Sequence, residues 1–182
     1  MRTSLGDDES ISNYVLTASR AATTLFENGL YGHFLVVLYS TIDTSGLLHA
    51  PAATTSASST TFKAWAETFF IPHIRENVTA TDLWAARCAV LHTYGTVSDL
   101  SRSGRARQIQ YYHGDPNKQE LADFVEITNR LDDGRHIAVH LGDFGAAFGK
   151  ALIDFVPVLM NRCASCQATA KRLRDVMQVY PA

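Results

Sequence analysis

The feature that most constrains this chain is an arginine lying among apolar residues in a stretch where both ends of a helix are marked. The stretch, TATDLWAARCAVLHTYG, runs from Thr79 to Gly95. Thr79 and Asp82 have the spacing of a capping box, which starts a helix, and Gly95 is placed where a left-handed residue would end it. The pattern predicts one helix that carries both Arg87 and His92.

The side chains nearest to Arg87 on such a helix lie three and four positions away. All of them are apolar: Leu83, Trp84, Val90 and Leu91. A guanidinium keeps its proton in proteins, so in these surroundings it requires an acidic partner, a cleft or an interface. A charged group in conflict with its neighbours often marks a functional site, which makes Arg87 the first candidate residue.

His92 falls in the last turn of this helix, where the helix dipole favours a charged imidazolium that suits a proton donor. Five residues on a helix correspond to about 7.5 Å of rise and about 140° of rotation, so Arg87 and His92 do not share a face. They converge if the arginine wraps around the helix, if the last turn distorts, or if a second copy of the chain completes the site. The third route predicts a homodimer.

The length of 182 residues suits one well-formed core, so we expect a single domain over residues 1–182. The net charge of −2 argues against nucleic-acid binding by the whole surface and leaves only a local site for it. Three cysteines without a secretory leader predict a cytoplasmic protein. The apolar runs at 34–39 and 152–160 are too short or interrupted for a membrane span, so no membrane partner is expected.

Helical spacing of apolar residues predicts further helices from Ser10 to Asn28 and over 62–70. β-Branched residues at 31–48 would allow a strand, but the length favours a buried helix. Asp43 lies in this segment and needs a partner, for which Arg87 is the natural candidate. For Asp43 a core ion pair is favoured over a direct chemical role. Residues 49–61, rich in Ala, Ser and Thr, predict a flexible surface connector.

The segment after the marked helix has a different composition. Three arginines without an acid follow in SRSGRAR: Arg102, Arg105 and Arg107. Alternating patterns at 107–112 and 136–141 predict two strands that pair as a small antiparallel ribbon, with a helix between them from Pro116 to about Leu131. A long C-terminal helix from residue 143 should kink or split at Pro157. The expected fold is therefore a mainly α helical bundle with a small antiparallel β ribbon.

Metal and cofactor sites are not expected. Cys163 and Cys166 have a metal-like spacing, but no second ligand pair lies nearby. His113, His136 and His140 could share one face of the ribbon, although surface histidines are the favoured interpretation.

The Arg87-x4-His92 pair resembles the signature of the HEPN superfamily (higher eukaryotes and prokaryotes nucleotide-binding), whose members are compact helical bundles with this motif on a late core helix. Tyr39-Ser-Thr-Ile-Asp43 is similar to the second-helix segment of such proteins, where a polar or acidic residue faces the motif. The resemblance covers residues 10–95 as a helical core. Residues 96–142 (basic loop, strands and helix) and 143–180 (C-terminal helix) complete the domain. Active members often carry Asn, Asp or His directly after the arginine, where this chain has Cys88.

The resemblance implies a metal-independent endoribonuclease that leaves a 2′,3′-cyclic phosphate at a dimer cleft. Arg87 and His92 would be catalytic, with Asp43 and Cys88 as supporting residues. Arg102, Arg105 and Arg107 would guide the RNA backbone. Many relatives act in toxin–antitoxin or defence systems, so an antitoxin is one expected partner.

Two other functions stay open at this stage. One is a non-catalytic HEPN-like module that binds RNA, a nucleotide or a partner protein. The other is a helical assembly subunit in which Arg87 only locks a dimer.

Overall fold

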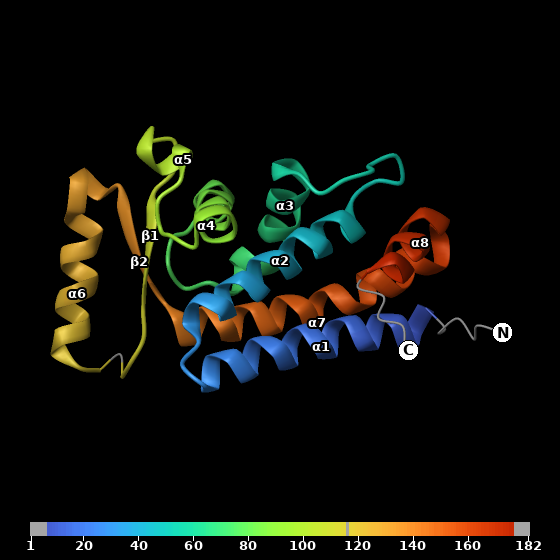
Figure 1. Cartoon of the computed structure of the whole chain (residues 1–182), viewed down its shortest axis with the longest axis horizontal. Coiled ribbons are helices and arrows are strands. Elements are labelled where there is room, and N and C mark those ends of the chain that lie inside the picture. The colour runs from blue at the N-terminus through green and yellow to red at the C-terminus, as the bar shows by residue number, and fades with distance from the viewer. Residues whose placement is uncertain (1–6, 116, 177–182) are drawn as a thin grey trace.

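The structure is a computed structural model that describes residues 7–115 and 117–176. Its described part is mainly α-helical, as predicted, with a two-stranded ribbon and one separate helix at one end (Figure 1). The elements, in chain order, are α1 (Asp7–Glu27), α2 (Tyr31–His49), α3 (Ser59–Trp65) continued by a π turn (Ala66–Phe70) and a 3-10 turn (Ile71–His73), α4 (Ala80–Thr93), α5 (Asp99–Arg102), β1 (Gln108–Tyr112), α6 (Gln119–Arg130), a 3-10 turn (Leu131–Gly134), β2 (His136–His140), α7 (Leu141–Ser165) and α8 (Gln167–Asp175).

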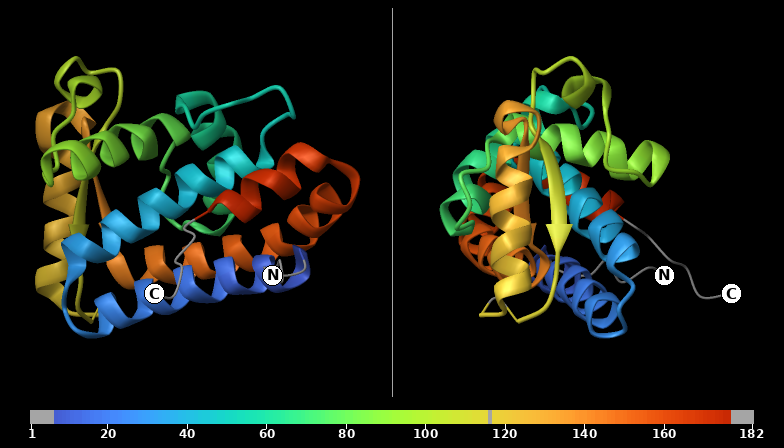
Figure 2. Two further views of the ribbon diagram at one scale, coloured as in Figure 1. Left: turned by 45° about the vertical axis from the view of Figure 1, so that its right-hand side comes forward. Right: turned by 90° about the vertical axis from the view of Figure 1, so that its left-hand side faces the viewer.

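The core lies between three long helices that run along the length of the molecule, α1, α2 and α7 (Figures 1 and 2). Short α3 and the turns after it fill the space above α7 with aromatic side chains. The largest fully buried side chains are Trp65, Tyr39, Phe62, Phe70, Phe144, Phe148 and Phe155. Because α2 is apolar on most of its sides, it forms the buried helix that its length predicts rather than a strand.

The two strands are parallel, so the prediction of an antiparallel ribbon was wrong. Gln108 pairs with His136, and the register continues to Tyr112 opposite His140. The physical reason is the connection between the strands. Helix α6 follows β1 and precedes β2 in the chain, and it returns the chain to the end of the ribbon where β1 began, so both strands run in the same direction. The predicted helix start at Pro116 lies outside the described residues.

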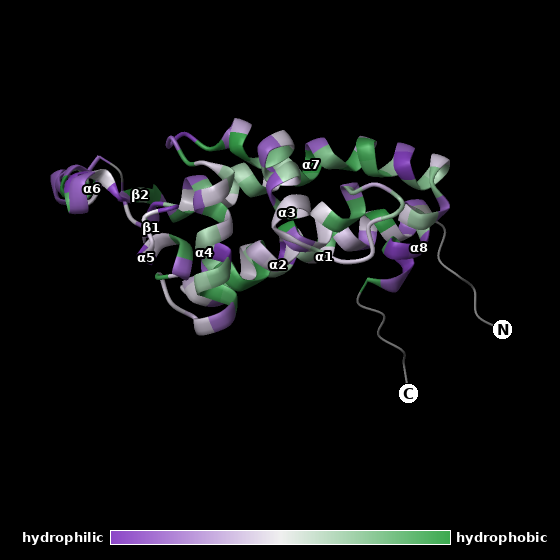
Figure 3. Cartoon of the chain, turned by 90° about the horizontal axis from the view of Figure 1, so that it is seen from above, coloured by the Kyte–Doolittle hydropathy of each residue, from purple (hydrophilic) through white to green (hydrophobic). Residues whose placement is uncertain are grey.

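Helix α6 is mainly hydrophilic and lies against the ribbon, apart from the three long helices (Figure 3). Its Asn129 side chain accepts a hydrogen bond from the backbone N–H of Ala138. The Glu76 carboxylate in the same way accepts from the N–H of His140. The outer edge of β2 is therefore satisfied by side chains instead of a third strand.

The C-terminal helix breaks at a different residue from the one predicted. Helix α7 continues through Pro157, whose side is exposed, while Phe155 and Leu159 stay buried. The break comes at Cys166, which is extended (φ −137°, ψ 102°), and the carbonyl of this residue accepts from Thr169 at the start of α8. Because Phe155 and Leu159 are packed in the core on both sides of Pro157, the helix remains continuous at the proline. The end predicted near residue 179 lies outside the described residues.

The connector after α2 is fixed at its beginning, where the sequence predicted a flexible segment. The Arg172 guanidinium of α8 donates to a series of backbone carbonyls, those of Leu47, Ala50, Pro51, Ala52 and Thr54. Arg162 of α7 donates to the Ala50 carbonyl as well, at 2.6 Å. The Leu47 carbonyl lies in the last turn of α2 and the other carbonyls follow the helix, so the two arginines fix the chain where it leaves α2. Within the described residues, no helix combines the length and hydropathy needed to cross a membrane.

We expect Arg172→Ala to lower the free energy of unfolding by about 2–3 kcal/mol, because several carbonyls would lose a charged donor. Chemical denaturation measures this change. The neighbouring exposed Lys171→Ala is the matched control and should leave the free energy of unfolding unchanged. Equal stability of the two variants would contradict a structural role for the Arg172 bonds.

Candidate functional site

Helix α4 begins as predicted, with a complete capping box. The Asp82 backbone N–H donates to the Thr79 hydroxyl at 3.1 Å, and the Asp82 carboxylate accepts from the Thr79 N–H at 3.0 Å. The prediction for the other end was wrong by one residue. Tyr94, not Gly95, is the left-handed residue (φ 52°, ψ 30°), and tertiary contacts of its side chain outweigh the usual preference for glycine.

Arg87 pairs with Asp43 across the contact between α4 and α2, as the sequence predicted. The Nε atom of Arg87 donates to Oδ2 of Asp43 at 2.8 Å, and Nη2 lies 2.7 Å from the same oxygen. The two side chains retain 18% and 13% of their exposure, so this ion pair is largely screened from water but not sealed. A pair in such a position restricts the guanidinium to one orientation.

Arg87 and His92 converge within a single chain. The Nη1 atom of Arg87 lies 3.3 Å from Nε2 of His92. Of the three routes to convergence, the structure has the first: the long arginine side chain reaches around the helix. The His92 side chain is exposed, which leaves the imidazole open to a ligand from solvent.

The guanidinium also lies over an aromatic ring. The Cζ atom of Arg87 is 4.9 Å from the centre of the Trp84 ring, within the range of a cation–π contact. Trp84 in turn packs edge-on against the buried Phe62, with ring centres 5.4 Å apart. An acid, an aromatic ring and an imidazole therefore surround the guanidinium.

Burial raises the pKa of the Asp43 carboxyl, although the hydrogen bond and charge of Arg87 and the charge of His92 act in the opposite direction. The second oxygen, Oδ1, is buried and has no hydrogen-bond partner among the residues that the structure describes. Because one oxygen of this carboxyl accepts no hydrogen bond from the described part of the chain, burial has the largest effect on its pKa. Asp43 thus orients Arg87 while holding its own proton to higher pH than an ordinary aspartate.

Arg107, predicted to contact RNA, is engaged in the fold. Its Nη2 and Nε atoms donate to Oδ2 of Asp82, at 2.7 and 3.2 Å, and its backbone N–H donates to Oδ1 at 2.7 Å. It also donates to the Asn77 carbonyl. Burial would raise the pKa of Asp82, but these bonds and those from Thr79 outweigh it and hold the pKa below its usual value.

The other predicted residues are near the surface. Arg102 is exposed and lies 3.7 Å from the Asp99 carboxylate, and Arg105 donates to the Ser103 hydroxyl at 3.0 Å. Cys88 is half-buried, and no contact described for this chain joins it to Arg87 or His92. The structure therefore brings together Arg87, His92 and Asp43, but not the three arginines or Cys88.

A second contact between α4 and α2 involves two residues that the sequence interpretation missed. The hydroxyl of Tyr94 is 3.1 Å from Nδ1 of His33 on α2, and their rings meet edge-on with centres 5.5 Å apart. Tyr94 could have been noticed in the sequence, because it is an aromatic residue directly before the glycine at the end of a predicted helix. His33 carries no signal of this kind, because its partner comes from a distant part of the chain.

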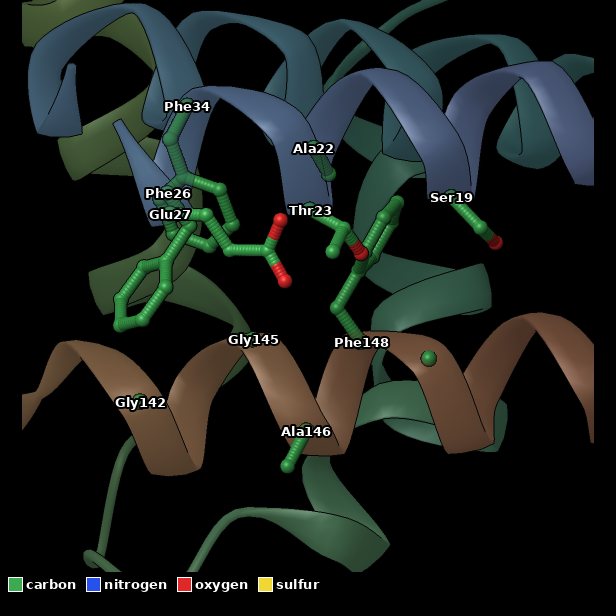
Figure 4. A pocket seen from close by; sticks show the side chains of 11 residues that line it. Ser19, Ala22, Thr23, Phe26, Glu27, Phe34, Gly142, Gly145, Ala146 and Phe148 are labelled. Atoms are coloured by element: carbon green, nitrogen blue, oxygen red, sulfur yellow. The ribbon is translucent and has the colours of Figure 1, made fainter. Parts of the chain in front are cut away.

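A separate cleft of about 350 Å³ lies between α1 and α7 (Figure 4). Its walls are apolar and include Phe26, Phe34 and Phe148, and the Glu27 carboxylate points into it. None of its lining residues belongs to α4, so this cleft is distinct from the Arg87 cluster. Among the residues described, no group of three or more His, Cys, Asp or Glu side chains is placed to hold a metal ion.

Comparisons with protein-family models, with curated proteins and with solved structures found no match to this chain. The functional argument therefore depends on the geometry of the site.

We expect Asp82→Asn to lower the free energy of unfolding by about 2 kcal/mol near neutral pH. This is less than the roughly 3–5 kcal/mol for breaking a fully buried pair, because Arg107 keeps 28% of its exposure. The folded pKa of Asp82 is depressed, so its contribution is present above the unfolded pKa and is lost as pH falls through the folded value.

Denaturation curves measured from about pH 7 down to about pH 3 test this sign. The difference between wild type and Asp82→Asn should shrink toward the acid end. Asp99→Asn, which alters an exposed acid, is the control and should follow the wild-type curve. A difference that stays constant over the whole range would contradict the assignment.

Proposed function

We propose that this chain is a metal-independent endoribonuclease of HEPN type, with Arg87 and His92 as its reacting pair. The observation that carries the proposal is the 3.3 Å approach of Nη1 of Arg87 to the exposed imidazole of His92. Asp43 holds the opposite edge of the same guanidinium. A phosphate that reaches Nη1 would at the same time be next to an imidazole.

In the proposed reaction the 2′-hydroxyl of RNA gives up its proton, and its oxygen forms a bond to the adjacent phosphorus. The bond from phosphorus to the 5′ oxygen breaks, and that oxygen takes up a proton. The products are a 2′,3′-cyclic phosphate and a 5′-hydroxyl, with no net change in protons. His92 accepts the first proton or donates the second, a task for a group whose ordinary pKa is near neutrality.

Arg87 stabilises the negative charge that grows on the phosphate oxygens. Nε and Nη2 face Asp43, whereas Nη1 faces His92 and would donate to a ligand that binds beside the imidazole. Trp84 and Asp43 hold the guanidinium in place before the substrate arrives, which reduces the reorganisation required during the reaction.

A homodimer is part of the proposal, because one proton must be removed and another supplied. Two copies of the motif that face a shared cleft would provide one His92 for each step. Arg102 and Arg105, exposed after α4, would then guide the RNA backbone. An antitoxin or another partner protein that covers this surface would block the reaction.

A second candidate is a non-catalytic module that binds RNA, a nucleotide or a partner protein. The observation in its favour is that Arg87 is already locked to a half-buried acid and joins α2 to α4. In this case RNA would bind and remain intact. If the pair only stabilises an assembly, removal of Arg87 would dissociate a dimer and leave RNA unaffected.

We expect wild-type protein to cleave RNA in the presence of EDTA, and His92→Ala to lower the rate by about 10²–10⁴-fold, because a proton-transfer group is lost. Gel analysis of a labelled RNA measures the rate, and a DNA oligonucleotide of the same sequence should remain intact. His73→Ala removes an imidazole that pairs with Asp154 and serves as the control. Intact RNA with folded wild-type protein would leave the binding module as the better proposal.

A double variant separates the chemical role of Arg87 from its structural role. Asp43→Leu combined with Arg87→Met replaces the ion pair with apolar residues, which often leaves stability unchanged or higher. We expect this variant to unfold at a denaturant concentration close to that of wild type and to lose RNA cleavage. Retained cleavage would contradict the role of Arg87 at the phosphate.

A further inference from the structure

Helices α2 and α4 are in contact and cross each other: α4 is seen nearly end-on in Figure 1, where α2 runs across the view. Two contacts join them: Asp43 near the end of α2 meets Arg87, whereas His33 near its beginning meets Tyr94 at the end of α4. His33 and Asp43 are ten positions apart, which corresponds to about 15 Å along α2. His92 belongs to the same stretch of α4, so polar and aromatic groups follow one seam between the two helices.

Tyr94 occupies this seam in an unfavourable backbone conformation. It is left-handed (φ 52°), although a glycine, which takes that conformation without cost, is the next residue. Its side chain is 57% exposed. The contact of the hydroxyl with α2 accounts for this strain, while the exposed part of the side chain remains accessible to a ligand.

Helix α2 is shaped to accept the Tyr94 side chain. A Cβ atom at Gly32 would overlap the Tyr94 hydroxyl, so only glycine allows this approach. The next residue, His33, contacts the same hydroxyl at 3.1 Å. The hydroxyl end of the ring is therefore fixed by two neighbouring residues of α2, while much of the side chain stays exposed.

We propose that Tyr94, held by His33, forms a subsite that stacks a nucleobase of single-stranded RNA beside the phosphate site at Arg87 and His92. The proposal rests on the proposed function. Tyr94 is two residues from His92, so their Cα atoms are within about 7 Å of each other. A phosphate at Arg87 and a base on Tyr94 would belong to neighbouring parts of one RNA strand.

The chemistry of the seam favours RNA over an apolar protein surface. Aromatic side chains stack on any base, and positive groups hold the intervening backbone, a combination typical of single-strand binding. Here the Tyr94 hydroxyl contacts the His33 imidazole, and the Arg87 guanidinium contacts the His92 imidazole two residues earlier in the chain. A protein partner would have to cover these polar groups as well as the ring.

The test compares Tyr94→Asn with Tyr94→Phe. Asn tolerates the left-handed conformation but removes the ring, whereas Phe keeps the ring and removes only the hydroxyl. The probe is a 2′-O-methylated oligoribonucleotide, which cannot be cleaved by this chemistry, and an abasic oligonucleotide of the same length. Fluorescence anisotropy at one fixed salt concentration measures binding of both.

Tyr94→Asn should weaken binding of the base-bearing probe by about 5–150-fold, the range expected for one stacked base. Tyr94→Phe should bind nearly as wild type does, and the abasic probe should not distinguish wild type from Tyr94→Asn. Equal binding of the base-bearing probe to wild type and Tyr94→Asn would overturn the subsite, as would equal losses with both probes. Equal free energies of unfolding establish that the variants are folded.

The outcome separates the subsite from the nuclease proposal. If wild type leaves unmodified RNA intact but Tyr94→Asn loses base-dependent binding, the subsite holds and the nuclease fails. If RNA is cleaved with an unchanged KM in Tyr94→Asn, the nuclease holds and the subsite fails. A change in oligomeric state with unchanged RNA binding would assign the ring to a protein interface and also overturn the subsite.

Discussion

The ion pair between Arg87 and Asp43 is the interaction on which the rest of the candidate site depends. It joins α4 to α2 at a seam where both side chains are largely screened from water. Two donors of the guanidinium meet one carboxylate oxygen, and the Trp84 ring lies against its face. Because these contacts restrict the arginine, its remaining amino group is directed to His92 instead of turning freely in solvent.

The pairs Arg107–Asp82 and Arg87–Asp43 differ in how many hydrogen bonds the aspartate accepts. This difference distinguishes a structural ion pair from a candidate functional one. Asp82 receives bonds from Arg107 and Thr79, and these lower its pKa in spite of burial. Asp43 has Arg87 on one oxygen and no described partner on the other, and burial raises its pKa. The first carboxylate completes a capping box and fixes the chain before β1. The second keeps unused hydrogen-bonding capacity beside an exposed imidazole.

Local rules predicted the helices, the capping box at Thr79 and the partnership of Arg87 with Asp43, because each depends on neighbouring residues or on one stranded charge. They failed where long-range packing decides. The ribbon is parallel because α6 carries the chain back, and the helix end falls at Tyr94 because α2 binds its hydroxyl. The role of Arg107 could not be predicted either, since its acidic partner lies twenty-five residues earlier in the chain.

The convergence of Arg87 and His92 inside one chain changes what a dimer would contribute. A second copy is not required to bring the arginine to the imidazole, because the arginine side chain already spans that distance. In the proposed reaction it would instead supply another imidazole for the second proton transfer, together with more of the cleft. In the proposed function, one chain would supply the phosphate site at Arg87 and the base site at Tyr94, and the second copy would supply the imidazole for the second proton transfer.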